Sequence, residues 1–225
     1  MRFAKMQGAG NDFVLVEAQG EEREWPELAR AVCDRHFGVG ADGLILALPS
    51  ALADVRMRMF NPDGSEAEMC GNGVRCLAKY AVERGLARPR EGRIAIETVP
   101  GVLTAELSGE EGRIERVRVS MGRPRFAPAD IPMAVEVEPP IKDFPLEIMG
   151  QRLRLTCLSL GNPHAVYFYA QPIERFPLEV MGPEVENHRI FPRRANFEVV
   201  RLVGRDALDV RVWERGAGAT LACGS

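Results

Sequence analysis

Two cysteines that each precede a glycine, Cys70 and Cys223, could do acid–base chemistry in this chain. Cys70 lies in a glycine-rich stretch, residues 61–75, which follows a strand-like run and leads into a helical one. A thiol at the start of a helix meets unpaired backbone N–H groups and the positive end of the helix dipole. Both influences lower the pKa of a thiol toward neutrality. The stretch therefore indicates a reactive thiol, although a buried structural cysteine fits it equally well.

Cys223 repeats the surroundings of Cys70 at a distance of 153 residues. With this shift Asn61 corresponds to Glu214. Each is a polar residue at the end of a strand-like run. Each of the two regions therefore presents a strand, a terminal polar residue, a glycine-containing loop and then Cys-Gly. Chance could produce Cys-Gly twice, but it is much less able to reproduce the strand and the polar residue as well.

A second match lies upstream, with a shift of 151 residues. Gly10-Asn11 falls on Gly161-Asn162, and an apolar strand follows each pair. Together the two matches predict two structurally similar halves, each built of strands wrapped on one helix. We assign residues 1–115 to the N-terminal half, with the first cysteine, and residues 116–225 to the C-terminal half, with the second.

Equivalent loops of two pseudo-symmetric halves can face one cleft, so two thiols could approach a ligand from opposite sides. Inverting a carbon that carries hydrogen requires a base on one face and an acid on the other, and a thiol can serve as either. The α-hydrogen of an amino acid is a weak acid, so the site must stabilise a developing carbanion and exclude water. Helix N-termini that open at Cys-Gly would supply N–H donors for this purpose.

The composition restricts the class of protein. A net charge of −3 gives no indication of nucleic acid or an anionic membrane as a partner, and 46% hydrophobic residues suit a globular protein with a sizeable core. The five cysteines are dispersed without CxxC spacing, and only three histidines occur, so we expect neither a disulfide framework nor a structural zinc site. The sequence shows no signal peptide and no membrane span, which predicts a cytoplasmic protein.

Short strands outnumber helices along the chain, and residues 114–119 alternate apolar and charged side chains as an antiparallel strand does. Helical spacing favours helices at 25–36 and 74–83, and a helix is expected within 176–190. We predict an α+β fold in which each half is a mostly antiparallel sheet or barrel wrapped around a central helix. Three cysteines fall on apolar faces of these elements and are interpreted as core residues: Cys33, Cys76 and Cys157.

Five segments carry a resemblance to a known family. They span nearly the whole chain: residues 5–13, 61–75, 161–165, 191–196 and 214–224. In this combination they resemble the diaminopimelate epimerases, cofactor-independent isomerases of lysine and peptidoglycan-precursor biosynthesis. The resemblance implies epimerisation of LL-2,6-diaminopimelate to meso-diaminopimelate by two thiols. It implies a small amino acid as the partner, no cofactor, no metal, no nucleic acid and no membrane, and it is compatible with a homodimer.

Carried over residue by residue, the resemblance implies that Cys70 and Cys223 are the catalytic acid and base. It implies that His164 and Glu214 are catalytic polar partners, which poise the thiols and hold the substrate. The positions that match substrate-binding residues of the family are Asn11, Asn61, Gly71, Asn72, Asn162, Asn196, Glu214, Arg215, Gly224 and Ser225. Taken singly, an asparagine is more often a turn residue, and Glu214 with its neighbour could be a solvated charge pair.

The chain departs from the family pattern at two side chains and at its C-terminal end. Many members carry glutamine where Gly43 stands and an acidic residue where Ala219 stands, so recognition of the distal end of the substrate stays open. By the repeat, Cys223 should open a second central helix, and family members continue through such a helix and further strands. That helix is missing here, so we expect a truncated C-terminal half, rather than a frameshifted product or a chain completed by another, and we expect poor activity or stability.

Three other functions stay open. A racemase of another amino acid on the same fold would show itself by its rates on a panel of amino acids. An inactive truncated homologue that only binds amino acids would bind them without exchanging the α-hydrogen for solvent deuterium. A thiol redox protein would also use facing cysteines, but the chain lacks CxxC spacing, and a disulfide between the two would remove both the acid and the base.

Overall fold

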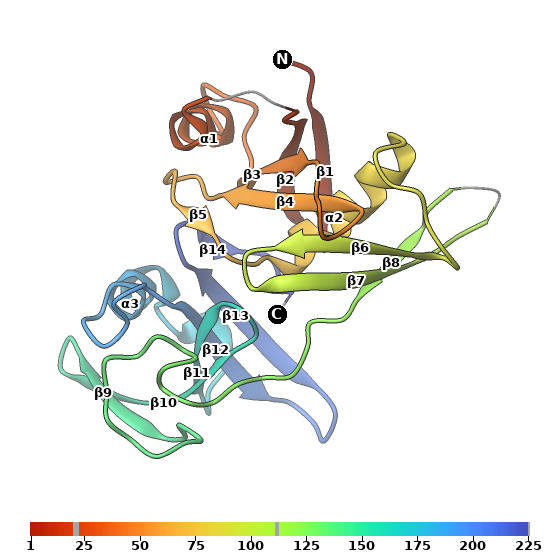
Figure 1. The fold of residues 1–225 in the computed structure, drawn as a ribbon. Coiled ribbons are helices and arrows are strands. Elements are labelled where there is room, and N and C mark those ends of the chain that lie inside the picture. The colour runs from red at the N-terminus through yellow and green to blue at the C-terminus, as the bar shows by residue number, and fades with distance from the viewer. Residues whose placement is uncertain (20–22, 111–112, 225) are drawn as a thin grey trace. The chain divides into compact units, whose positions relative to one another are not determined.

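The computed structural model describes residues 1–19, 23–110 and 113–224, which form a mixed fold of many strands and few helices (Figure 1). The predicted α+β class is thus confirmed. The chain divides into two compact units, residues 1–121 with Gly224, and residues 122–223. Among the described residues, no helix is both long enough and apolar enough to cross a membrane.

The first unit is built on one sheet with the strand order β1-β2-β3-β4-β6-β7-β8, and β5 pairs with β4 beside this path. Its strands are β1 (Ala4–Gly8), β2 (Asn11–Glu17), β3 (Gly43–Leu48), β4 (Val55–Phe60), β5 (Glu66–Ala67), β6 (Arg93–Thr98), β7 (Gly101–Ser108) and β8 (Arg116–Val119). Most neighbours are antiparallel, but β2 pairs with β3, and β4 with β6, in parallel. The pairing of β8 with β7 carries this sheet past residue 115, and the division of the chain there into functional halves stays a prediction.

The two faces of this sheet pack against different helices. α2 (Gly71–Glu83) packs against the face that carries Phe13 and Ile45, and is the central helix of this unit. α1 (Trp25–Cys33) packs against the opposite face, which carries Leu44. Successive side chains of a strand point to opposite faces, so a strand buried on both is apolar along its length, as β3 is.

The second unit is built on a six-stranded sheet with the order β14-β13-β12-β11-β10-β9 (Figure 1). Its strands are β9 (Phe144–Ile148), β10 (Gln151–Ser159), β11 (Pro163–Phe168), β12 (Asn196–Leu202), β13 (Leu208–Glu214) and β14 (Gly218–Thr220). Only β11 and β12 pair in parallel. The helices of the described part of this unit are η1 (Ile173–Arg175) and α3 (Leu178–Glu186), and α3 packs against the face that carries Phe197.

The antiparallel pairing of the two units repeats with the shift read from the sequence. Phe60 lies opposite Leu44 in the first sheet, and 153 residues later Trp213 lies opposite Phe197 in the second. The short strands β5 and β14 pair with their neighbours in registers that differ by the same shift. The predicted pseudo-symmetry is therefore present in the register of individual strands.

The parallel pairs of the two units correspond as well. Phe13 lies opposite Gly43 in the first sheet, and His164 lies opposite Asn196 in the second. The shift is 151 residues on one strand and 153 on the other, as the two sequence matches require. Equivalent backbone positions thus carry apolar residues in one unit and polar residues in the other.

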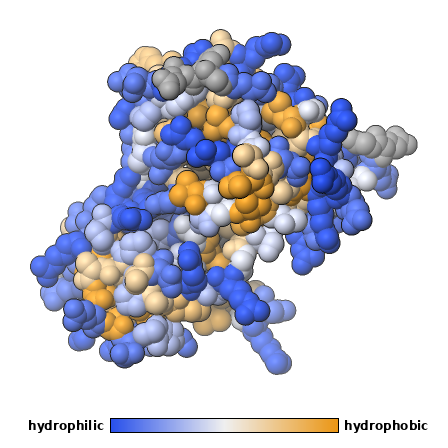
Figure 2. Space-filling view, in the orientation of Figure 1, coloured by the Kyte–Doolittle hydropathy of each residue, from blue (hydrophilic) through white to orange (hydrophobic). Residues whose placement is uncertain are grey.

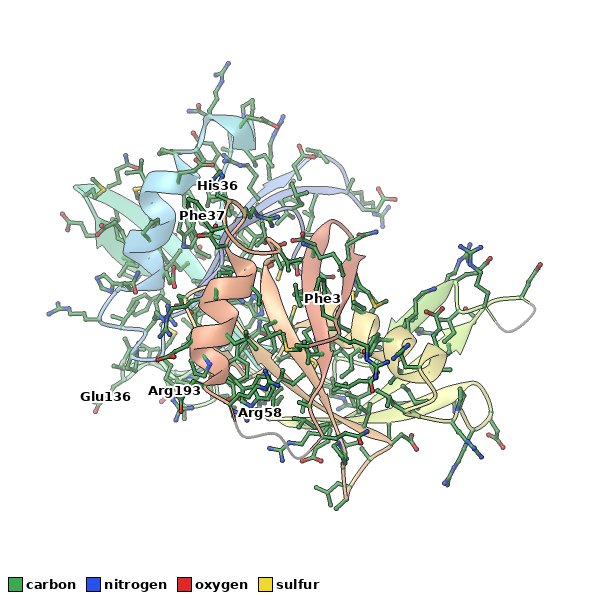
Figure 3. All side chains as sticks on the ribbon, turned by 90° about the horizontal axis from the view of Figure 1, so that it is seen from above. Phe3, His36, Phe37, Arg58, Glu136 and Arg193 are labelled. Carbon is green, nitrogen blue, oxygen red and sulfur yellow. The ribbon has the colours of Figure 1, made fainter. Side chains whose placement is uncertain are left out.

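α1 ends earlier than the spacing predicts. The Asp34 carboxylate accepts hydrogen bonds from the N–H groups of His36 and Phe37, both at 2.7 Å, and so closes a turn directly after Cys33. These bonds, that of Phe37 first, lower the pKa of Asp34. Figure 3 shows His36 and Phe37 at this turn. Apolar side chains also reach the surface elsewhere, in patches among hydrophilic residues (Figure 2), as in most folded proteins.

A network of charges fixes the glycine-rich loop that leads into β3. Arg35 Nη2 donates to Asp12 Oδ1 at 2.9 Å and to Asp42 Oδ1 at 2.7 Å, and Lys5 Nζ lies 2.8 Å from Asp12 Oδ2. Burial raises the pKa of Asp12, but hydrogen bonds from Arg35 and Lys5 outweigh burial and hold it well below its usual range. Burial and the neighbouring Asp12 charge raise the pKa of Asp42.

Replacing Arg35 with glutamine is expected to lower the free energy of unfolding at pH 7 by roughly 1 kcal/mol, because two neighbouring carboxylates lose their half-exposed shared cation. The lowered pKa of Asp12 contributes stability above pH about 4, and this contribution is lost as the pH falls. The difference between parent and variant should therefore shrink in thermal melts below pH about 4. Arg56→Gln, which removes an exposed pair with Glu97 at 3.6 Å, is the control and should cost less. An unchanged melt of the Arg35 variant at pH 7 would contradict the expectation.

Candidate active site

Cys70 is the N-cap residue of α2. Its backbone is extended, and its Sγ accepts a hydrogen bond from the Gly73 N–H at 3.4 Å. The N–H groups of a first helical turn have no carbonyl partner within the helix, so the sulfur lies where negative charge is stabilised. The helix begins at Gly71, three residues before the predicted start, because the two glycines of the first turn hide its helical spacing in the sequence. Cys70 itself is buried.

Gly71 and Asn72 lie against Gly224 within the first unit. A Cβ at Gly71 would lie 2.6 Å from the Gly224 carbonyl oxygen, so only glycine fits there. Asn72 is buried, and its Oδ1 accepts a hydrogen bond from the Arg75 side chain. Three of the predicted substrate-binding positions thus lie together at the start of α2. Ser225, also predicted to bind substrate, lies outside the described residues.

Asn11 opens β2 and Asn61 follows β4, and both side chains are buried. Asn61 Nδ2 donates to Ser65 Oγ at 3.0 Å, within the turn after β4. Asn11 Oδ1 is buried and accepts no hydrogen bond from any described residue. A buried amide oxygen without a donor is costly, and an N–H group of a ligand would satisfy it. Gly8, the strand partner of Asn11, packs close to the backbone of Asn72, so Asn11 lies near the start of α2.

In the second unit His164 is held between two polar side chains. Its Nδ1 lies 2.6 Å from Glu198 Oε1, and its Nε2 lies 2.9 Å from Asn162 Oδ1. The neighbouring residues Ala165 and Phe197 belong to the core under α3, so His164 and Glu198 point to the opposite face of the sheet. Their side chains are only 4% and 8% exposed. Both ring nitrogens of His164 are therefore engaged, away from water.

Two further predicted residues lie at the ends of neighbouring strands, and a third, Arg215, follows directly after one of them. Asn196 opens β12 opposite His164, and its Oδ1 accepts a hydrogen bond from the Arg215 N–H at 2.8 Å. Glu214 ends β13, and its Oε1 accepts a hydrogen bond from Thr220 Oγ1 at 2.7 Å. The ends of β11, β12 and β13 thus bring an imidazole, an amide and a carboxylate to one edge of the sheet.

Cys223 lies close to the His164–Glu198 pair. Its Sγ, a ring nitrogen of His164 and a carboxylate oxygen of Glu198 all lie within 4.8 Å of one another. Thiolate, imidazole and carboxylate are also the ligand types of zinc, so these three residues could hold such an ion. In the structure a hydrogen bond already joins the imidazole to the carboxylate. The arrangement thus places a thiol next to a hydrogen-bonded imidazole and carboxylate.

The other cysteines lie in apolar cores, and their predicted structural role is confirmed. Burial raises the pKa of the Cys33 and Cys157 thiols to about 12 and that of Cys76 to about 11. A thiol with such a pKa stays protonated at neutral pH and is a poor base. Cys70 and Cys223 are the remaining candidates for acid–base work.

The two departures from the family pattern differ in their surroundings. Gly43 is buried in β3, where a Cβ would lie 2.8 Å from the Met59 side chain and 3.1 Å from the Phe60 carbonyl oxygen. A longer side chain at this position would require Met59 to move. Ala219 is exposed on β14.

Glu198 is the residue of this cluster that sequence reasoning missed. It stands in β12 next to Phe197, in a strand that is buried along most of its length. Carboxylates are seldom buried unless they are paired, so a carboxylate within the apolar part of a strand is a usable signal. Its partner His164 lies 34 residues earlier, beyond the reach of a local pattern.

Comparison with known proteins gives consistent results. A model of the diaminopimelate epimerase family matches residues 3–127 and 156–225. Curated relatives named diaminopimelate epimerase from Moorella thermoacetica and Pelotomaculum thermopropionicum are 52% and 51% identical, and each alignment covers 100% of this chain and 80% of the relative. Two solved structures show the same fold with a TM-score of 0.74 each. A probable proline racemase from Agrobacterium radiobacter K84 and a hydroxyproline epimerase from Agrobacterium vitis share 16% and 14% identity over 99% of this chain, and 73% and 72% of theirs.

Proposed function

This chain belongs to the diaminopimelate epimerase family, and we propose that it epimerises LL-2,6-diaminopimelate to meso-diaminopimelate with Cys70 and Cys223 as acid and base. It is an isomerase, and the reaction serves lysine and peptidoglycan-precursor biosynthesis. One observation carries the assignment of the thiols. Cys70 lies at a helix N-terminus, a setting that stabilises a thiolate, and Cys223 lies within 4.8 Å of a ring nitrogen of His164.

The reaction balances with two thiols alone. One cysteine, as the thiolate, takes the α-proton, and the electron pair of the broken C–H bond stays on the α-carbon. The other cysteine, as the thiol, gives its proton to the opposite face of that carbon and becomes a thiolate. The configuration has changed, no electrons have been lost or gained, and the two sulfurs have exchanged protonation states.

The remaining residues of the site bind the zwitterionic substrate. The carbanion is stabilised where its charge spreads into the α-carboxylate, which backbone N–H groups of the Cys-Gly segments hold at the start of α2. The unpartnered amide oxygen of Asn11 accepts a hydrogen bond from an ammonium group. His164 and Glu214 are the polar partners of the thiols. The other substrate-binding positions of the proposal are Asn61, Gly71, Asn72, Asn162, Asn196, Glu214, Arg215, Gly224 and Ser225.

The test is conversion of LL-diaminopimelate in D2O by the purified protein. We expect meso-diaminopimelate that carries one solvent deuterium on the inverted α-carbon, measured by chiral chromatography with mass spectrometry. A chelator should leave the rate unchanged, because the proposed steps use no metal. Faster inversion of another amino acid would favour the racemase alternative, and binding without deuterium exchange would favour a non-catalytic binding protein. The cytoplasmic location and the homodimer stay predictions.

A further inference from the structure

The two units carry different residues at equivalent points of one strand register. Phe13 and Ile45 occupy in the first sheet the positions that His164 and Glu198 occupy in the second. Phe13 and Ile45 are completely buried and pack with α2 in an apolar core. The strand arrangement is therefore satisfied by apolar side chains at these points. A histidine–carboxylate pair is not something that the fold requires there.

The pair is also costly to bury. A carboxylate that leaves water loses its hydration, and a buried ion pair compensates this loss only when hydrogen bonds satisfy its other atoms. Glu198 Oε1 faces His164 Nδ1 at 2.6 Å, but Glu198 Oε2 is buried without a hydrogen-bond partner among the described residues. Apolar residues in the same place would be at least as stable. A polar pair that costs stability and lies beside a thiol indicates a role in chemistry.

The contacts of the ring fix its orientation. His164 Nδ1 faces a carboxylate oxygen of Glu198 at 2.6 Å, and Nε2 faces the amide oxygen of Asn162 at 2.9 Å. A carboxylate is the stronger hydrogen-bond acceptor of the two, so Glu198 determines which way the ring turns. A ring nitrogen of His164 lies within 4.8 Å of the Cys223 sulfur. The orientation that Glu198 imposes on the ring is therefore the one that Cys223 meets.

We propose that Glu198 is a positioning residue of the epimerase reaction: it holds the ring of His164 in one orientation beside the Cys223 sulfur, so that the ring stays aligned with that thiol during proton transfer. This rests on the proposed function, because it assigns proton transfer to Cys223. Glu198 touches no reacting atom and takes no proton during the cycle.

Among the described residues, the strand partners of the pair are apolar: Leu158 of β10 lies opposite His164, and Val212 of β13 lies opposite Glu198. Two other carboxylates, Glu214 of β13 and Glu147 of β9, belong to the same side of the sheet. A hydrogen bond from Thr220 satisfies one oxygen of Glu214, and Arg152 lies opposite Glu147. Cys157 lies in the core on the opposite face, where burial raises its pKa. The carboxylate that contacts the ring is that of Glu198.

The decisive variant is Glu198→Gln, which keeps the size of the side chain and removes its charge. We expect kcat to fall about 10- to 100-fold, the usual effect of losing a group that orients a reactive ligand, while KM stays within about threefold. Nitrogen NMR of ¹⁵N-histidine gives a second readout, since the chain has three histidines and His164→Gln assigns the signal. The signal of the ring nitrogen that faces residue 198 should shift in Glu198→Gln, because the carboxylate no longer accepts its hydrogen bond. Glu198→Asp keeps the charge and should restore part of kcat.

Glu179→Gln is the matched control, because Glu179 lies on α3, on the opposite face of the sheet, with an exposed side chain. It should leave kcat and the ring signal unchanged. Removing one partner of a buried pair is destabilising, so Glu198→Gln should melt below the parent. A lower melting temperature with an intact kcat would mean a purely structural role and would overturn the proposal, and so would an unchanged ring signal. Loss of the proposed function looks different: inversion would then be absent from the parent, or would persist in Cys223→Ala.

Discussion

Replacing either Cys70 or Cys223 with alanine is expected to abolish inversion of diaminopimelate, by about 10³-fold or more in kcat. Each thiol acts on one face of the α-carbon, and a positioned acid or base contributes about 10²- to 10⁴-fold to a proton transfer. The measurement is the rate of meso-diaminopimelate formation in D2O, with α-deuterium followed at the same time. Because one thiol remains in each variant, exchange with retention should persist for one configuration of the α-carbon, and for opposite configurations in the two variants.

Cys157→Ala is the control for these variants. Its thiol lies in the core of the second unit, with a pKa that burial raises to about 12, so its loss should leave inversion intact. Melting curves of all three variants separate loss of chemistry from loss of fold. Inversion that survives in Cys70→Ala or in Cys223→Ala would show that the two-thiol mechanism is wrong.

Replacing Gly182 with alanine is expected to destabilise the second unit by about 2–3 kcal/mol. In an exposed helix this change would stabilise by about 1 kcal/mol, since alanine is the better helix former. A Cβ at Gly182 of α3 would lie 2.5 Å from two ring atoms of Trp213, and forcing atoms into a packed core costs about 1–3 kcal/mol or more. The indole also donates to Glu186 at 2.7 Å, so it cannot swing away freely. The clash therefore outweighs the gain in helix propensity.

A thermal melt tests the Gly182 variant, with an expected loss of about 5–10 °C for a chain of this size. Gly204→Ala is the control, because a Cβ there would meet nothing closer than 3.8 Å. Trp213 precedes Glu214, so kcat of Gly182→Ala should fall moderately as well. A melt equal to that of the parent would mean that the α3 core rearranges at no cost.

Much of the fold was predictable because its signals are local or repeated. The apolar strands, the helix after Cys70 and the 153-residue repeat each follow from spacing along the chain. The positions at which the helices end were harder to predict from the sequence. α1 stops at Cys33 because the side chain of Asp34 satisfies the next N–H groups, a choice that apolar periodicity does not encode. Parallel pairing of β2 with β3 joins segments far apart in sequence, and local patterns carry no information on it.

The candidate site also has a part that local sequence patterns predict and a part that depends on contacts between distant segments. The position of Cys70 at a helix N-terminus was predictable, because a glycine-rich loop directly before a run with helical spacing marks the start of that helix. The partner of His164 was not, because strand register alone brings Glu198 to it. The network of Asp12 with Arg35 likewise depends on a contact between distant segments. The family resemblance pointed to individual residues of the site, and it did not point to either of these two contacts.

β12 carries a core residue and a site residue side by side, with Phe197 packed toward α3 and Glu198 toward His164. Because side chains alternate, inserting or deleting one residue ahead of this pair within Asn196–Leu202 would exchange the two faces. Phenylalanine would then stand beside the thiol and a carboxylate would enter the core. A point substitution in β12 changes the side chains on one face of the sheet, whereas an insertion or deletion changes the side chains on both faces. Lineages that diverge from this chain should therefore place their gaps in the loops on either side of β12 and none within it.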